Sequence, residues 1–178
     1  MPPLSATVAV ILGLLVICTD LYARRVPNRG LLAAALAGIA AMLVLPSVST
    51  GPAEAMAGLL LGLVLLLPFY LIGWMGAGDV KLFAVLGLLL GGGALLPLWI
   101  IASLLAGVHA VAWIMAERGF MAGFIALSPP AASLYRFVKE SGFSRRMEAS
   151  RQGRRGIPYA AYLGIASLLI VFTGVSHG

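Results

Sequence analysis

Long apolar runs, each close to the length of a membrane-crossing helix, most constrain what this chain can fold into. The first begins at Leu4, and further runs rich in Leu, Ala and Val recur along most of the sequence. A hydrocarbon core about 30 Å thick requires roughly 20 apolar residues in a helix. Alternation of polar and apolar residues with a period of two is absent, which argues against a barrel. The sequence therefore predicts an all-α, polytopic membrane protein.

The composition favours the same class of protein. Of the 178 residues, 61% are hydrophobic and only 10% are charged, whereas soluble domains average about 25% charged residues. The length predicts one integral-membrane domain over residues 1–178. The run from Leu4 to Ile17 has no basic residue before it, so we interpret it as a retained transmembrane helix rather than a signal peptide. Cys18 is the single cysteine and can form no internal disulfide.

Turn-forming residues divide the apolar runs into six expected spans. Pro27 and Asn28 follow two arginines, and Asn28 is able to cap the next helix. A polar turn at 46–53 and the triple glycine at 91–93 make further breaks. The last break leaves a short fourth segment. The expected spans are at about 4–21, 29–46, 54–73, 79–92, 94–116 and 157–175, with a long loop at about 117–156.

The basic residues predict the orientation of these spans. With six spans, all twelve Lys and Arg residues fall on one side of the membrane, and the loops on the other side carry none. The positive-inside rule makes the basic side cytoplasmic and both termini non-cytoplasmic. We therefore attribute the net charge of +6 to topology and anionic lipids, not to nucleic-acid binding. In the long loop we expect interfacial helices followed by a solvated linker.

Two aspartates touch apolar runs at the predicted cytoplasmic face. Asp20 ends the first span and Asp79 begins the fourth, so the topology places them at similar depth. Ionisable residues at such positions are costly and usually functional. Two facing carboxyl groups share a proton, so that one is able to deprotonate a water while the other polarises a carbonyl. The alternative is structural, since either aspartate could cap a helix or form an inter-helix hydrogen bond.

Other catalytic chemistry has little support in the sequence. His109 stands alone in its span, and no His or Cys cluster with metal-ligand spacing is present. Ser103 lies six residues before His109, off a shared helical face, so the two give no signal of a serine mechanism. The stretch "GAGDVK" lacks the spacing of a phosphate-binding loop. We expect neither a metal nor a cofactor.

The residues around Asp79 leave two interpretations open. Gly76 and Gly78 either allow positive φ values and the close approach of an extended substrate strand, or pack helices together as small residues. Lys81 is two positions from Asp79, a spacing that points the two side chains apart on a helix. It either extends to the lipid headgroups or neutralises a nearby charge.

Three motifs in order resemble the type IV prepilin peptidases. "GAGDVKL", from Gly76 to Leu82, matches the GxGD signature with the following x-K-L. "DLYARRVPN" places Asp20 seven residues before the pair Pro27 and Asn28, as the family does. "GIPYA" contains Pro158 and Tyr159, with the proline suited to the first turn of the sixth span and the tyrosine expected to face the cavity. Presenilin-like proteases share GxGD alone, whereas all three motifs together are specific.

The resemblance implies an aspartic endopeptidase of the bacterial inner membrane. Asp20 and Asp79 would be catalytic, and the other motif residues would bind substrate or shape the site. The substrates would be prepilins and pseudopilins, cleaved at the cytoplasmic face after a short basic leader. Because the rim of the enzyme is also basic, we expect it to anchor lipids rather than to attract the leader. The chain has Ala160 where the family often has glycine.

The chain also resembles one branch of that family more than another. Longer members carry a cysteine-paired cytoplasmic domain linked to N-methylation, and this chain has no such insert. It is similar to the short, peptidase-only branch of tight-adherence (Flp-type) systems. Two rivals remain: a GxGD protease acting on other membrane segments, and a small proton-coupled transporter that uses Asp20 and Asp79. The position of both acids at one face argues against a transport pathway. The sequence does not define the particular pilin or the oligomeric state.

Overall fold

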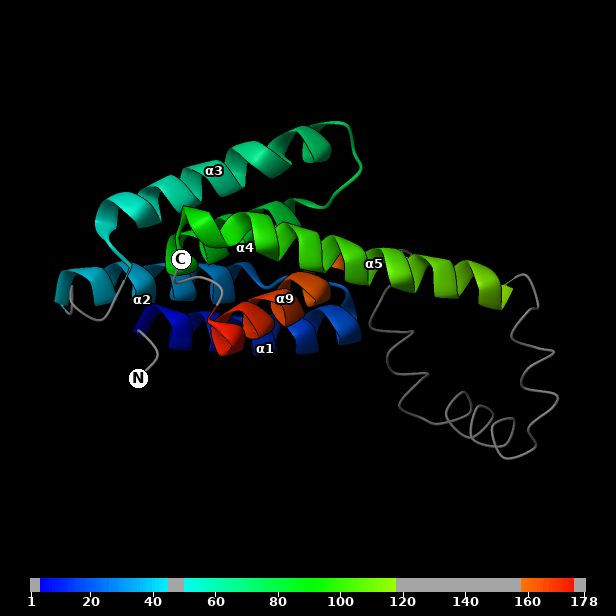
Figure 1. Ribbon diagram of the computed structural model, residues 1–178, viewed down its shortest axis with the longest axis horizontal. Helices are drawn as coiled ribbons and strands as arrows, with labels where there is room; N and C mark the ends of the chain where they lie inside the picture. Colours follow the sequence, from blue (N-terminus) through cyan, green and yellow to red (C-terminus); the bar gives the residue numbers. More distant parts are fainter. Residues whose placement is uncertain (1–3, 45–49, 118–157, 175–178) are drawn as a thin grey trace, which may run out of the picture.

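The computed structural model describes residues 4–44, 50–117 and 158–174 as a bundle of helices (Figure 1). No strand occurs within these residues, so the prediction of an all-α fold is confirmed. The helices in the described ranges are α1 (Leu4–Ala23), α2 (Asn28–Val44), α3 (Pro52–Leu71), α4 (Ala77–Leu90), the 3-10 turn η2 (Gly92–Ala94), α5 (Leu95–Glu117) and α9 (Tyr159–Thr173).

The helix boundaries follow the breaks that the sequence indicates. Pro52 occupies the first turn of α3, where its missing N–H has no cost. Gly91 ends α4 with a φ of 85°, a left-handed value that favours glycine, and η2 then leads into α5. The predicted break at 91–93 is therefore confirmed. The interfacial helices and linker predicted for the long loop lie outside the described residues.

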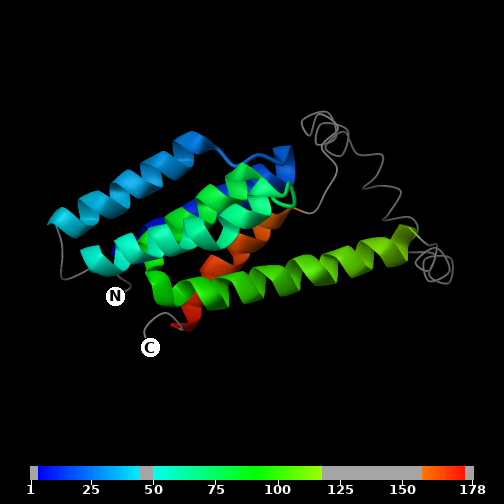
Figure 2. The same cartoon turned by 90° about the horizontal axis from the view of Figure 1, so that it is seen from above.

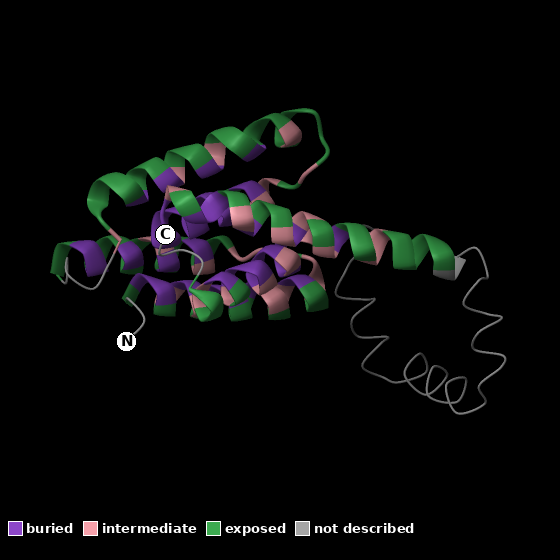
Figure 3. Ribbon diagram, viewed as in Figure 1, coloured by how far each residue is buried: buried purple, intermediate pink, exposed green. Residues whose placement is uncertain are grey.

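Helix α4 is the centre of the bundle. Val80 and every residue from Leu82 to Leu90 are buried, whereas Lys81 is exposed. Helices α1, α2, α3, α5 and α9 all contact it. In Figure 3 the ribbon of α4 is almost entirely in the buried colour, while the outer sides of α3 and α5 are exposed. A helix that is apolar on all sides is buried in this way.

Glycines let the helices approach each other at main-chain distance. A Cβ atom on Gly58 of α3 would collide with the carbonyl oxygen of Gly87 in α4, and one on Gly87 would collide with that of Gly58. On the other side of the bundle, a Cβ atom on Gly164 of α9 would lie 2.8 Å from the carbonyl oxygen of Gly13 in α1. Small residues at helix contacts are typical of membrane proteins, where lipid supplies no hydrophobic drive for association.

The outer surface of the bundle is apolar. Three helical segments are long and apolar enough to cross a membrane, namely Leu4–Ala23, Pro52–Leu71 and Gly92–Met115, and two shorter apolar helices are Asn28–Val44 and Tyr159–Thr173. Large side chains such as Leu43 and Phe172 are nearly 80% exposed, at 79% and 78%. Such a surface fits a membrane protein, because lipid replaces water as the surrounding solvent.

The contact between Gly58 and Gly87 gives a first prediction. Gly58→Ala should lower the free energy of unfolding by about 1–3 kcal/mol, because the added methyl group meets main-chain atoms that have no rotamer freedom. Gly107→Ala is the matched control, since a Cβ atom there has nothing within 4 Å. Thermal unfolding in detergent micelles measures both. Equal melting temperatures for the two variants would contradict the assigned contact.

Candidate active site

The two aspartates lie at the same end of the bundle. Asp20 is in the last turn of α1 and Asp79 is in the first turn of α4. The end of α1, the start of α4 and the start of α9 converge in Figure 2, although the three segments are far apart in the sequence. The two carboxyl groups act on each other electrostatically. The fold thus brings together the two acids that sequence analysis selected.

Asp20 holds the start of α9. Its side chain is only 6% exposed, and its Oδ2 accepts a hydrogen bond of 2.9 Å from the backbone N–H of Ala161. Ala161 belongs to the first turn of α9, where helix N–H groups have no partner within the helix. A carboxylate is also favoured at this end by the helix dipole. Asp20 therefore links α1 to α9 through an inter-helix cap.

Asp79 caps the start of its own helix, α4. Gly76 is the N-cap of α4, and its backbone N–H donates a hydrogen bond to the half-buried carboxyl group of Asp79. This is the reach-back half of a capping box, in which the third residue of a helix satisfies the N–H of the cap. Both structural roles considered for the aspartates therefore occur. They also hold the two carboxyl groups in place at one end of the bundle.

Tyr159 connects the aspartates to α5. Its hydroxyl forms a hydrogen bond of 3.2 Å with the hydroxyl of Ser103. Its side chain also interacts electrostatically with Asp79. A tyrosine that contacts α5 while lying near the acid of α4 fixes the relative positions of three helices. The sequence analysis considered Ser103 only as a partner of His109, so it missed this bond.

Tyr162 is a further residue of this region that the sequence analysis missed. It interacts electrostatically with Arg24 and Asp20, and its ring centroid is 5.9 Å from that of His109. A signal for it existed, because it follows Tyr159 by three residues and so shares a face of the same helix. His109 packs against Tyr162 and also against Trp113, at 6.2 Å. These ring contacts give His109 a packing role between α5 and α9.

The glycines beside Asp79 correct one expectation. Gly76 has a φ of −75°, and Gly78 lies within α4. The positive-φ glycines of the described residues are instead Gly73, Gly91 and Gly174. Of the two interpretations left open, positive φ values are therefore excluded, because Gly76 is an extended N-cap and Gly78 lies within α4.

Gly78 serves close packing. A Cβ atom on Gly78 would lie 3.1 Å from Cβ of Val26, which is tighter than ordinary contacts. The segment between α1 and α2 can therefore rest directly on the first turn of α4. The contact joins the connection that follows α1 to the helix that carries Asp79.

Two of the other predicted site residues take positions slightly different from those expected. Helix α2 begins at Asn28 itself, and the carbonyl of Pro27 accepts a hydrogen bond of 3.1 Å from the backbone N–H of Leu31. Asn28 therefore lies in the first turn, not at the cap. Pro158 occupies the N-cap of α9, one position before the first turn in which it was expected. Pro158 has no side chain that could cap the helix, and Asp20 supplies the acceptor for the N–H of Ala161 instead.

Lys81 lies apart from the aspartates. Together with Asn28 it lines a groove between α2, α3 and α4, and neither Asp20 nor Asp79 belongs to that lining. The two-residue spacing on a helix accounts for this separation. Among the described residues, no group of three or more His, Cys, Asp or Glu side chains is placed to hold a metal ion.

The fold and this site define an all-helical membrane protein with an acidic pair at one end of its bundle. The family model described as the type IV leader peptidase family matches residues 7–111, more than half of the chain. The chain therefore belongs to the type IV leader peptidase family, whose members are peptidases. The match includes both aspartates and ends before α9. Comparisons with curated proteins and with solved structures gave no match.

The bond from Ala161 to Asp20 gives a second prediction. Asp20→Ala should lower the free energy of unfolding by about 1–2 kcal/mol, because the N–H of Ala161 loses its acceptor. Asp20→Asn is the control, since its amide oxygen is able to accept the same bond. Thermal unfolding of the two purified variants tests this. The inter-helix cap is refuted if Asp20→Ala melts no lower than Asp20→Asn.

Proposed function

We propose that this chain is an aspartic endopeptidase that removes the leader peptide of type IV prepilins of the Flp-like kind and of pseudopilins. Asp20 and Asp79 activate the water that attacks the scissile bond. The observation that carries the proposal is the convergence of these two carboxyl groups, from α1 and α4, in a member of the leader peptidase family.

The chemistry requires one carboxylate and one carboxylic acid. The carboxylate takes a proton from water as the water oxygen bonds to the carbonyl carbon, while the acid donates a hydrogen bond to the carbonyl oxygen. When the tetrahedral intermediate collapses, the C–N bond breaks and the leaving amine takes up a proton from the pair. Two carboxyl groups that repel each other share a proton readily, so the pair is suited to both roles.

The capping bonds support this chemistry by fixing both acids. The N–H of Ala161 holds Asp20, and the N–H of Gly76 holds Asp79. Groups that are already oriented need little rearrangement as the transition state forms. Tyr159 is placed near Asp79 and held by Ser103, so it is the site-shaping residue with the most direct support. No metal or cofactor takes part in the proposed reaction.

The active site is proposed to face the cytoplasm of a bacterial inner-membrane protein with six spans and both termini outside. The described basic residues support this orientation. Arg24, Arg25 and Arg29 lie between α1 and the first turn of α2, and Lys81 is in the first turns of α4. All are thus at the end of the bundle that holds the aspartates. The positive-inside rule assigns such an end to the cytoplasm.

The substrate chemistry follows from the family and from the apolar bundle. A prepilin presents a short basic leader and an apolar helix, which would lie among the enzyme helices in the membrane. Gly76, Gly78, Pro27 and Pro158 are proposed to shape the region around the acids, whereas Asn28 and Lys81 line the separate groove between α2, α3 and α4. The chain has one cysteine and no inserted cysteine-paired domain, so we propose leader cleavage without N-methylation.

Processing of a co-expressed prepilin tests the acid pair, with Asp20→Asn and Asp79→Asn as the variants. Each should lower the rate of leader removal by about 100-fold or more, because general acid–base catalysis contributes on that scale. Asparagine keeps the oxygen that accepts the capping bond, so the fold is preserved while the proton transfer is lost. Immunoblotting of precursor and mature pilin measures the rate.

The matched control is Glu54→Gln. Glu54 is also an acid at a helix start, but its carboxyl group lies against Gly91 at the other end of α4. This variant should process the prepilin at the normal rate. If either aspartate variant retains full processing, the two residues are only helix caps and the proposed mechanism fails.

A reporter fusion tests the orientation. An alkaline phosphatase fused within residues 141–152 should be inactive, and a green fluorescent protein fused there should be fluorescent, because the loop is proposed to lie in the cytoplasm. Fusion after residue 50, in the α2–α3 connection, is the control and should give the opposite pattern. Active phosphatase within 141–152 would reverse the proposed topology.

A further inference from the structure

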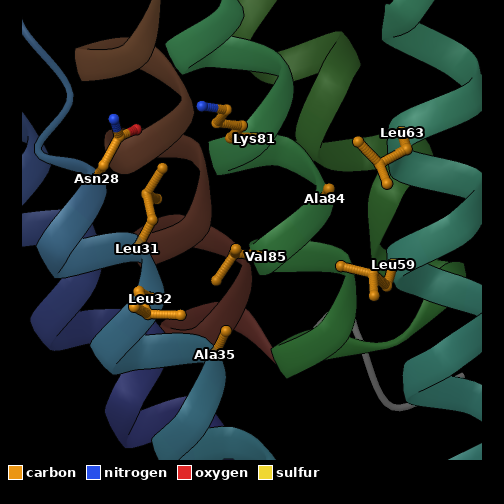
Figure 4. A pocket seen from close by; sticks show the side chains of 9 residues that line it. All are labelled: Asn28, Leu31, Leu32, Ala35, Leu59, Leu63, Lys81, Ala84 and Val85. Atoms are coloured by element: carbon orange, nitrogen blue, oxygen red, sulfur yellow. The ribbon is translucent and has the colours of Figure 1, made fainter.

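A groove with an apolar lining runs between α2, α3 and α4 (Figure 4). Its volume is about 410 Å³, and it is open to the surroundings of the bundle. Leu31 and Leu32 come from α2, Leu59 and Leu63 come from α3, and Val85 comes from α4. The bundle surface around the groove is apolar, and its lining includes neither Asp20 nor Asp79.

One end of the groove is polar. Lys81 and Asn28 lie together at that end in Figure 4, with the lysine ammonium directed towards the asparagine. Lys81 is the one exposed residue in the stretch from Val80 to Leu90. A cation and an amide thus stand at the mouth of an otherwise apolar groove. This arrangement matches an amphiphile with an anionic head.

The position of Lys81 suits a lipid phosphate. It lies at the end of the bundle where Arg25 and Arg29 are also exposed. Basic side chains at the ends of membrane helices reach the headgroup region, and those on the cytoplasmic side attract anionic lipids. The apolar part of the groove runs from this level along the helices, in the direction that an acyl chain takes.

The length of the groove discriminates against a docked helix. It spans about two turns of α2 and one turn each of α3 and α4, over residues 28–35, 59–63 and 81–85. At 1.5 Å per residue this is about 6–10 Å of helix axis, whereas a transmembrane helix needs a contact along about 30 Å. The lining also includes neither aspartate.

We propose that this groove is a binding site for an anionic phospholipid. The phosphate contacts the ammonium of Lys81 and the amide of Asn28, and the upper part of one acyl chain lies against Leu31, Leu63 and Val85. The proposal is independent of the peptidase reaction. A lipid bound here would bridge α2 and α3 over α4, and so would steady the helix that carries Asp79.

Native mass spectrometry of the purified protein tests the site. The full chain is released from nanodiscs made of equal parts phosphatidylglycerol and phosphatidylcholine, and the retained lipids are counted. The wild type should retain phosphatidylglycerol preferentially. Lys81→Gln should reduce that preference about fivefold, which is the factor expected from one basic side chain at an anionic surface. Lys81→Arg should keep it.

Two further variants make the test specific to the groove. Arg25→Gln removes an exposed charge from the same end but outside the groove, so it should lower phosphatidylglycerol retention less than Lys81→Gln does. Ala35→Phe fills the apolar end and should lower phosphatidylglycerol retention while leaving Lys81 in place. The proposal is overturned if Lys81→Gln and Arg25→Gln lose lipid equally, if Ala35→Phe has no effect, or if phosphatidylcholine is retained as well as phosphatidylglycerol.

Discussion

The N–H groups at the starts of α4 and α9 impose the constraint on which the acidic end of this bundle depends. In an apolar environment each such group needs an acceptor, since water is scarce and an unpaired donor is costly. Asp79 supplies the acceptor for Gly76, and Asp20 supplies it for Ala161. The same two bonds gather the carboxyl groups at one end. Asp20 and Asp79 therefore both cap these helices and supply the carboxyl groups of the proposed reaction.

The fold could be predicted from the sequence to the extent that local physics determines it. Apolar runs of spanning length, Pro52 and the triple glycine at 91–93 define where helices begin and end, and the observed helices follow them. Placement of Asp20 and Asp79 at one end also followed, because the direction of successive helices reverses. No local sequence pattern, however, indicates that α9 packs between α1 and α5.

The details of the site depend on that packing, so the sequence could not supply them. Ser103 meets Tyr159 only because α5 lies beside α9, and Gly78 is needed only because Val26 rests on it. Positive φ at Gly76 and Gly78 was one of two interpretations that the sequence left open, and the structure excludes it because the motif caps and begins a helix. The position of Tyr162 near the site could have been predicted, because it follows Tyr159 by three residues on the same helix, but it was not.

The contact between Gly58 and Gly87 has a mechanical consequence for this protein. Main-chain atoms of α3 and α4 touch there, and no side chain can rotate to loosen the contact. The pairing of α3 with α4 is therefore closest at the end of α4 that lies away from Asp79. Adding a side chain at either glycine would push these two helices apart and would change the position of the helix that carries Asp79.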